Sequence, residues 1–166
     1  EAAFNAHTAG VVYVYGPKSE PDLREVVKIA HQCHLPVLVD AAGELPPKSN
    51  LKSIAATGSD LIAFSGGKAI RGPQSTGILC GNKDLIGSAA LQMLDMDDHL
   101  ELWDPQSDLI DKTKFAGIPR HGIGRGFKVS KEEIIALLVA LRLFISGAYD
   151  VSVLTARSIL EKIVQG

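Results

Sequence analysis

One lysine in this sequence stands where its amine could do covalent chemistry. Lys68 follows an apolar run at residues 61–64 and the short turn Ser65-Gly66-Gly67. A buried strand that ends in this way carries the lysine to the carboxyl edge of a sheet, where open α/β sheets bind their ligands. Lysines in confined, partly desolvated pockets act as nucleophilic amines and form imines with carbonyl groups. Taken alone, the segment fits a solvated turn lysine equally well.

A carboxylate ends the preceding strand pattern. Residues 36–39 are an apolar run that ends in Asp40, 28 residues before Lys68. That spacing suits a strand–helix–strand unit, so both side chains should reach the same edge of the sheet. An aspartate that pairs with a protonated ring nitrogen and a lysine that forms an imine are the groups that a pyridoxal 5'-phosphate (PLP) site needs. Ser65, three residues before Lys68, could donate a hydrogen bond to the phosphate.

The elements that must position these residues follow an α/β pattern. Strands are expected at 11–15, 36–40, 61–65 and 77–80, and helices at 21–30, 51–56, 83–94, 131–146 and 149–164. The alternation of strands and helices predicts parallel pairing of the first three strands. The turn of about ten residues before the fourth strand is too short for a helical crossover, so that strand should pair antiparallel.

Two helix starts have recognisable capping residues. Ser130 and Glu133 have the spacing of a capping box, which predicts a helix that begins at Lys131. Asn50 is expected to cap the short helix over residues 51–56.

The histidines and cysteines do not form a convincing metal or disulfide pattern. His31 and His34 lie three residues apart near a helix C-terminus, but no third ligand is evident, so we favour an interaction with the helix dipole. Cys33 and Cys80 match neither metal-ligand nor disulfide spacing. We expect both to be small core residues in a reducing compartment, and the protein to be cytoplasmic. No metal site is predicted.

The polar stretch over residues 95–126 carries two patterns that resemble known motifs. A loop of this length is usually functional or disordered. The aspartates at 95, 97 and 98 lack the glycine and distal glutamate of a calcium-binding EF-hand, so we interpret them as solvated or capping residues. The glycines at 122, 124 and 126 follow no strand and are wrongly spaced for a dinucleotide fingerprint, so we reject that function.

Composition narrows the function classes further. The 166 residues are 46% hydrophobic with a formal net charge of −2, which fits one globular domain with a sizeable core. The near-neutral charge provides no electrostatic footprint for nucleic acid, and no apolar run approaches the ~18 residues that span a membrane. The chain begins in the middle of a pattern without a methionine. We therefore expect it to be a piece of a longer protein.

Three motifs together resemble one enzyme family. They are VLVDAAGELPP at 37–47, NLKSIAATGSDLIAFSGGKAIRGPQSTGILCG at 50–81 and IPRHGIGRGFKVSKEEIIALLVAL at 118–141. Their order and spacing resemble the selenium-transferase-like family of fold-type-I PLP enzymes over about residues 8–145. The resemblance implies part of the large PLP-binding domain over residues 1–146, with a three-layer, mostly parallel sheet. Residues 147–166 would then begin a helix that leads to a small C-terminal domain.

The resemblance implies roles for particular residues. Lys68 is similar to the Schiff-base lysine, Asp40 to the partner of the pyridine nitrogen, and Ser65 to a phosphate-binding hydroxyl. Gln74 and Ser75 would contact the phosphate of a neighbouring subunit, because these enzymes build shared sites in homodimers or larger homo-oligomers. Guanidinium groups bind carboxylates and phosphates well, although each could equally be a surface or ion-pairing group. The candidates for binding substrate are Arg71, Arg120 and Arg125.

The family contains more than one chemistry. The resemblance favours a lyase that acts on a small amino substrate by β-elimination, as in ammonia-lyases such as that for D-glucosaminate 6-phosphate. The alternative is L-seryl-tRNA(Sec) selenium transferase, for which tRNA would be a partner. A further alternative is an inactive fragment or an interaction module on the same fold.

The chain also departs from the family. Members carry, before the segment seen here, a glycine-containing phosphate loop and a residue that stacks on the ring, and neither is in this sequence. We therefore expect residues 1–166 alone to be inactive and to expose a wide apolar edge of the sheet.

Overall fold

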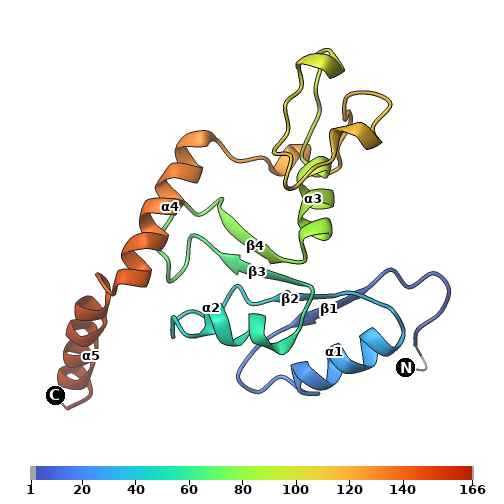
Figure 1. Cartoon of the computed structure of the whole chain (residues 1–166). Helices are drawn as coiled ribbons and strands as arrows, with labels where there is room; N and C mark the ends of the chain where they lie inside the picture. The colour runs from blue at the N-terminus through green and yellow to red at the C-terminus, as the bar shows by residue number, and fades with distance from the viewer. Residues whose placement is uncertain (1–2, 166) are drawn as a thin grey trace.

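The computed structural model describes residues 3–165, with residues 151–153 given by their backbone alone. At its centre is a four-stranded sheet in the order β1-β2-β3-β4 (Figure 1). The strands are β1 (Val11–Val14), β2 (Val37–Asp40), β3 (Leu61–Ser65) and β4 (Gly77–Gly81). β1 pairs parallel with β2, β2 pairs parallel with β3, and β3 pairs antiparallel with β4. The predicted directions of strand pairing are confirmed.

Helices flank this sheet, as the α/β pattern predicted. They are α1 (Leu23–Gln32), α2 (Asn50–Ser53), α3 (Lys83–Gln92), α4 (Lys131–Ser146) and α5 (Asp150–Gln165). A 3₁₀ turn over Ala55–Thr57 follows α2 and ends at Gly58, whose φ of 89° is left-handed. α4 begins with the predicted capping box, and it ends at Gly147, which is also left-handed with φ 82°. The boundary predicted after residue 146 coincides with this junction, but a separate domain there stays a prediction.

The two faces of the sheet are covered unequally. Val39 and Ile62 point to one face and are at most 1% exposed, packed in one core with side chains of α1, of α4 and of the turn after α2. Val12 and Val14 point to the other face, where they are 71% and 68% exposed. α3 reaches this second face at the amino ends of the strands, where Leu85 helps to line an apolar groove. The apolar surface that the sheet exposes therefore includes a face of β1 and is not confined to an edge.

Two local expectations differ from the structure. Asn50 does not cap α2 but begins it. Its side-chain amide donates to the Glu44 carbonyl oxygen at 2.7 Å, and its side-chain oxygen accepts from the Ser53 hydroxyl at 3.3 Å. Ser49 stands at the cap position without a side-chain hydrogen bond. Cys33 is exposed, since it ends α1 outside the core, and the prediction that it is a core residue is wrong. Cys80 is partly buried and packs against the core as expected.

The stretch over residues 95–126 is folded onto α3. The amides of Gly122 and Gly124 donate to the carbonyl oxygens of Leu94 and Gln92 at 2.9 and 2.8 Å, so the glycines dock on the end of the helix. Asp95 accepts a hydrogen bond from the His121 amide at 3.0 Å, which agrees with a capping role. Across residues 3–165, no three or more acidic, histidine or cysteine side chains gather as a metal site. None of the helices described is long and apolar enough to cross a membrane.

Candidate functional site

Asp40 and Ser65 project from the same face at the carboxyl edge of the sheet. The parallel register pairs Val14 with Asp40 and Asp40 with Ala63, so these three residues share a face. Ser65 lies two residues after Ala63 and therefore points the same way, since strand side chains alternate. This is the face on which Val14 is exposed. The strands thus bring together two of the three side chains on which the predicted site depends.

Lys68 lies just beyond Ser65 in the loop that joins β3 to β4. Its side chain is exposed, and its carbonyl oxygen accepts a hydrogen bond from the Arg71 amide at 2.9 Å. Within the described residues, the amine of Lys68 has no hydrogen bond or ion pair. The lysine is therefore at the predicted edge, with its amine available to a ligand.

The loop over residues 66–76, the lysine loop, is closed at its base by its own hydrogen bonds. The Gly66 amide donates to the Thr76 carbonyl oxygen at 2.9 Å, and the Gly72 amide donates to that of Gly66 at 2.8 Å. A Cβ atom on Gly67 would lie 2.6 Å from the Cα atom of Gln74. The glycines before Lys68 are thus needed because the loop packs tightly on itself.

The two polar side chains predicted to contact a phosphate are engaged inside this chain. The Gln74 amide group donates to the Gly67 carbonyl oxygen at 3.0 Å. The Ser75 hydroxyl donates to the carboxylate of Glu133 in the first turn of α4. The hydrogen bond from Ser75, followed by that from the Ser130 amide, lowers the pKa of Glu133 below its usual range. The sequence identified the capping role of Glu133. It did not predict the hydrogen bond between Ser75 and Glu133, because the two residues are 58 positions apart.

The candidate substrate-binding arginines are dispersed. Arg71 has a left-handed backbone with φ 63°, and its guanidinium lies 4.6 Å from the centre of the Tyr149 ring. Arg120 forms an ion pair with Asp97. Arg120 and Arg125 belong to the stretch after α3, which Figure 1 shows well separated from the β3–β4 loop beside α4. Arg71 therefore shares the β3–β4 loop with Lys68. Arg120 and Arg125 belong to a different part of the chain, and the fold does not add them to this loop.

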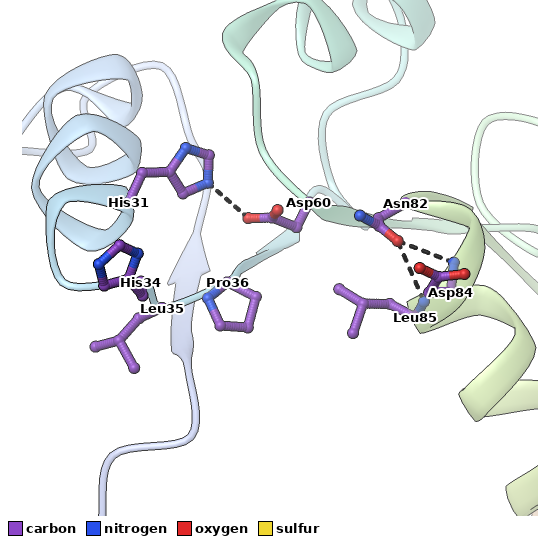
Figure 2. A pocket seen from close by; sticks show the side chains of 8 residues that line it. All are labelled: His31, His34, Leu35, Pro36, Asp60, Asn82, Asp84 and Leu85. Atoms are coloured by element: carbon purple, nitrogen blue, oxygen red, sulfur yellow. Dashed lines mark hydrogen bonds and ion pairs between the residues drawn. The ribbon is translucent and has the colours of Figure 1, made fainter. Parts of the chain in front are cut away.

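A second polar cluster lies at the opposite, amino edge of the sheet. Nε2 of His31 is 2.9 Å from Oδ2 of Asp60 (Figure 2). The same oxygen accepts the Val37 amide at 2.8 Å. Burial alone would raise the pKa of Asp60, but the bonds from His31 and Val37 outweigh it and the pKa lies below its usual value. His31 and Asp60 help to line an open cavity of about 480 Å³.

This cluster was not predicted from the sequence. His31 interacts with a carboxylate 29 residues away, in addition to its place in the last turn of α1. No local spacing signals such a pair. Its role here is to tie the end of α1 to the start of β3, at the edge away from Lys68.

Comparison with known proteins decides the family. The aminotransferase class-V family matches residues 14–97, just over half of the chain. The chain belongs to this family. Its members depend on PLP, and the family and relatives agree with the resemblance found in the three sequence motifs. The sheet and helices are accordingly part of a fold-type-I PLP enzyme domain.

Several relatives are similar over much of the chain. D-glucosaminate-6-phosphate ammonia lyase of Salmonella typhimurium is 28% identical over 98% of this chain and 37% of its own length. 5'-C-glycyluridine monooxygenase-decarboxylase of a Streptomyces species is 32% identical over 85% of this chain and 29% of its own. L-seryl-tRNA(Sec) selenium transferase of Mannheimia succiniciproducens is 31% identical over 51% of this chain and 21% of its own. The chain thus spans about a third or less of the length of most of these relatives.

A solved structure supports the same assignment. A structure of D-glucosaminate-6-phosphate ammonia-lyase superposes with a TM-score of 0.60 at 27% sequence identity. The superposition covers 88% of this chain and 32% of the ammonia-lyase chain.

The side chains at the carboxyl edge fit PLP. One oxygen of Asp40 accepts the Ala42 amide at 3.0 Å. Within residues 3–165, its other oxygen has no hydrogen-bond partner and can accept from a pyridinium N–H. The amine of Lys68 is equally available for an aldehyde. A carboxylate and an amine left available at the same edge are the donor set that this cofactor requires.

Proposed function

We propose that the protein is a PLP-dependent enzyme that acts on an amino-acid-type substrate. The observation that carries the proposal is the pair of available groups, Asp40 and Lys68, at one edge of a sheet in a chain of this family. Lys68 would hold the cofactor as a Schiff base, Asp40 would accept a hydrogen bond from the ring nitrogen, and Ser65 would donate to the phosphate. When bound, PLP withdraws electrons from the substrate carbon next to the nitrogen.

We further propose that the reaction is a β-elimination, in which the α-proton and a β-hydroxyl leave the substrate as water, and hydrolysis of the resulting enamine then releases ammonia and leaves a keto acid. Lys68 would then have a second role, because a lysine amine can accept the α-proton of the substrate. The relative named as an ammonia lyase aligns with 98% of this chain, and a structure of such an enzyme superposes on 88% of it. An anionic amino sugar acid such as D-glucosaminate 6-phosphate is the proposed substrate class, since Arg71 lies three residues after Lys68 and can pair with an anion.

The selenium transferase activity is the second candidate. Proteins of that name match this chain at 31% identity over about half of its length. The shorter match and the formal net charge of −2 favour the lyase.

The separation of Arg120 and Arg125 from the lysine loop supports a homo-oligomer with shared sites. Both arginines belong to the stretch after α3, which Figure 1 shows apart from the β3–β4 loop that contains Lys68. Within a homodimer or larger assembly, they would serve the site of a neighbouring subunit. Size-exclusion chromatography with light scattering on the complete protein tests this, and a monomer with full activity would contradict it.

A lysine substitution tests the cofactor assignment. The complete protein with PLP should form a borohydride-reducible adduct that mass spectrometry places on Lys68, and Lys68→Ala should abolish it. Lys83→Ala is the matched control, because Lys83 is an exposed lysine at the start of α3. An adduct that persists in Lys68→Ala would contradict the role of Lys68. No adduct in the unsubstituted protein would contradict PLP binding and favour an interaction module.

Two further assays separate the candidate reactions. The lyase predicts release of ammonia from D-glucosaminate 6-phosphate. The transferase predicts binding of seryl-tRNA instead, without ammonia release from the sugar acid.

A further inference from the structure

The carboxylate of Glu133 joins two parts of the chain that are distant in sequence. Its Oε2 atom accepts the Ser130 amide at 3.0 Å and completes the capping box of α4. Its Oε1 atom accepts the hydroxyl of Ser75 in the lysine loop. A capping box needs only the first of these bonds. The second bond therefore connects the helix to the loop in addition to the capping function.

A second contact between α4 and the lysine loop lies one helical turn further on. Leu137 is four residues after Glu133, so both side chains lie on one face of α4. A Cβ atom on Gly66 would lie 2.8 Å from Cδ1 of Leu137, and one on Gly72 would lie 3.0 Å from the same atom. Leu137 is 8% exposed. One face of α4 thus holds the loop by a polar contact and by close packing.

The loop transmits this attachment to Lys68. Its two ends are bonded to each other through Gly66 and Thr76, and the Gln74 side chain bonds back to Gly67, the residue before Lys68. Ser75 lies between Gln74 and Thr76, so a shift of Ser75 displaces both bonded neighbours. The backbone position of Lys68 is therefore coupled to that of Ser75.

We infer that Glu133 is a positioning residue for Lys68, acting through Ser75, and that Ser75 is a structural contact and not a phosphate ligand. The hydroxyl hydrogen of Ser75 is directed at a carboxylate. A phosphate at the same hydroxyl would lie beside that negative charge, which disfavours its binding. The inference deepens the proposed function and rests on it for the role of Lys68.

Hydrogen exchange on the complete protein without cofactor tests the contact by itself. Ser75→Ala removes the bond to Glu133 and leaves the capping box intact. A hydrogen bond to a charged group stabilises by enough that its loss should speed exchange of the amides in residues 66–76 about tenfold. Glu133→Gln should act in the same direction, because the amide nitrogen that replaces one carboxylate oxygen cannot accept a hydrogen bond and the remaining bond loses its charged partner. Ser75→Thr retains the hydroxyl and should restore slow exchange.

Two controls separate this effect from a weaker helix or a changed net charge. Ser130→Ala weakens the cap of α4 without touching Ser75, and Glu132→Gln removes an exposed charge from the same turn. Both should leave exchange in residues 66–76 within about twofold of the unsubstituted protein. The inference is overturned if either control speeds exchange as much as Ser75→Ala, or if Ser75→Ala itself has no effect.

The protein with PLP bound allows the environment of Lys68 to be measured through the visible absorption of its adduct. Ser75→Ala and Glu133→Gln should shift the pH dependence of the visible absorption of the Lys68 adduct together, and the double variant should shift it no further than the larger single variant. A phosphate ligand would behave differently: Ser75→Ala would weaken PLP binding with normal exchange in the cofactor-free protein, which would overturn the inference. Absence of any Lys68 adduct would defeat the proposed function, whereas the exchange result would be unchanged.

Discussion

Gly66, two residues before Lys68, is the position where the smallest added group should do the most damage. A Cβ atom there would lie 2.9 Å from the Thr76 carbonyl oxygen and 2.8 Å from Cδ1 of Leu137, and closer still to the Thr76 hydroxyl. Leu137 can move a methyl group, but Thr76 is 6% exposed and its hydroxyl donates to the Pro73 carbonyl oxygen at 2.6 Å. Gly66→Ala must therefore break this bond or widen the base of the loop.

Both responses cost free energy of similar size. Leaving a buried hydroxyl without its partner costs about 1–3 kcal/mol, and overpacking a tight site costs about 1–3 kcal/mol. We expect Gly66→Ala to lower the free energy of unfolding by about 2–4 kcal/mol. A displacement of Lys68 by about 1 Å should also reduce turnover about 100-fold.

Urea unfolding of the complete protein, with formation of the borohydride-reducible adduct as a second measurement, tests this expectation. Gly43→Ala is the matched control, since a Cβ atom there has no neighbour within 4 Å. It also follows a strand end, three residues after Asp40. A loss below about 0.5 kcal/mol for Gly66→Ala, or an equal loss for Gly43→Ala, would refute the packing of the lysine loop.

Three other predictions concern regions away from the lysine loop. Because the pKa of folded Asp60 lies below its usual 3.8, its ionised form stabilises the fold above that value, and the contribution is lost as the pH falls through the folded pKa. In Asp60→Asn, the free energy of unfolding should therefore fall less steeply between about pH 5 and pH 3 than in the unsubstituted protein. The same pH dependence in both proteins would argue against the His31–Asp60 pair. Ser130→Ala should lower stability by about 1 kcal/mol in urea unfolding, through the cap of α4. Phe115→Ala removes the ring that meets buried Trp103 at 5.9 Å, so limited proteolysis should cut residues 95–126 faster than in Ile123→Ala, whose side chain is 84% exposed.

The sheet could be predicted from the sequence because its signals are local. The apolar runs that became β1, β2, β3 and β4 are bounded by glycine, proline or aspartate, and the short link before β4 excludes a helical crossover. Asp40 and Ser65 could be placed at one edge because strand periodicity and parallel order together determine where their side chains point. The start of α4 could be predicted for the same reason, since the two residues of its capping box lie within four positions of each other.

Interactions between distant residues could not be predicted in the same way. The Asp60 carboxylate meets His31, and Ser75 meets Glu133, across 29 and 58 positions, and nothing in the residue types alone selects these partners. Asn50 shows how tertiary partners override a local preference. Asparagine side chains often cap helices, but here the side-chain amide donates to the Glu44 carbonyl oxygen, a partner that the local sequence does not reveal. Such outcomes depend on which groups the tertiary fold brings within reach.

The position of Asp40 also bears on how Lys68 acquires its reactivity. Asp40 and Ser65 share the face of the sheet on which Val12 and Val14 are 71% and 68% exposed, and Lys68 itself is exposed. An exposed lysine is a weak nucleophile, because the amine is activated only in a confined, desolvated site. The face that carries Asp40 and Ser65 is thus one that residues 3–165 leave largely uncovered. Under the proposed function, Asp40, Ser65 and Lys68 would supply the chemistry of the site, and groups other than residues 3–165 would have to confine the Lys68 amine.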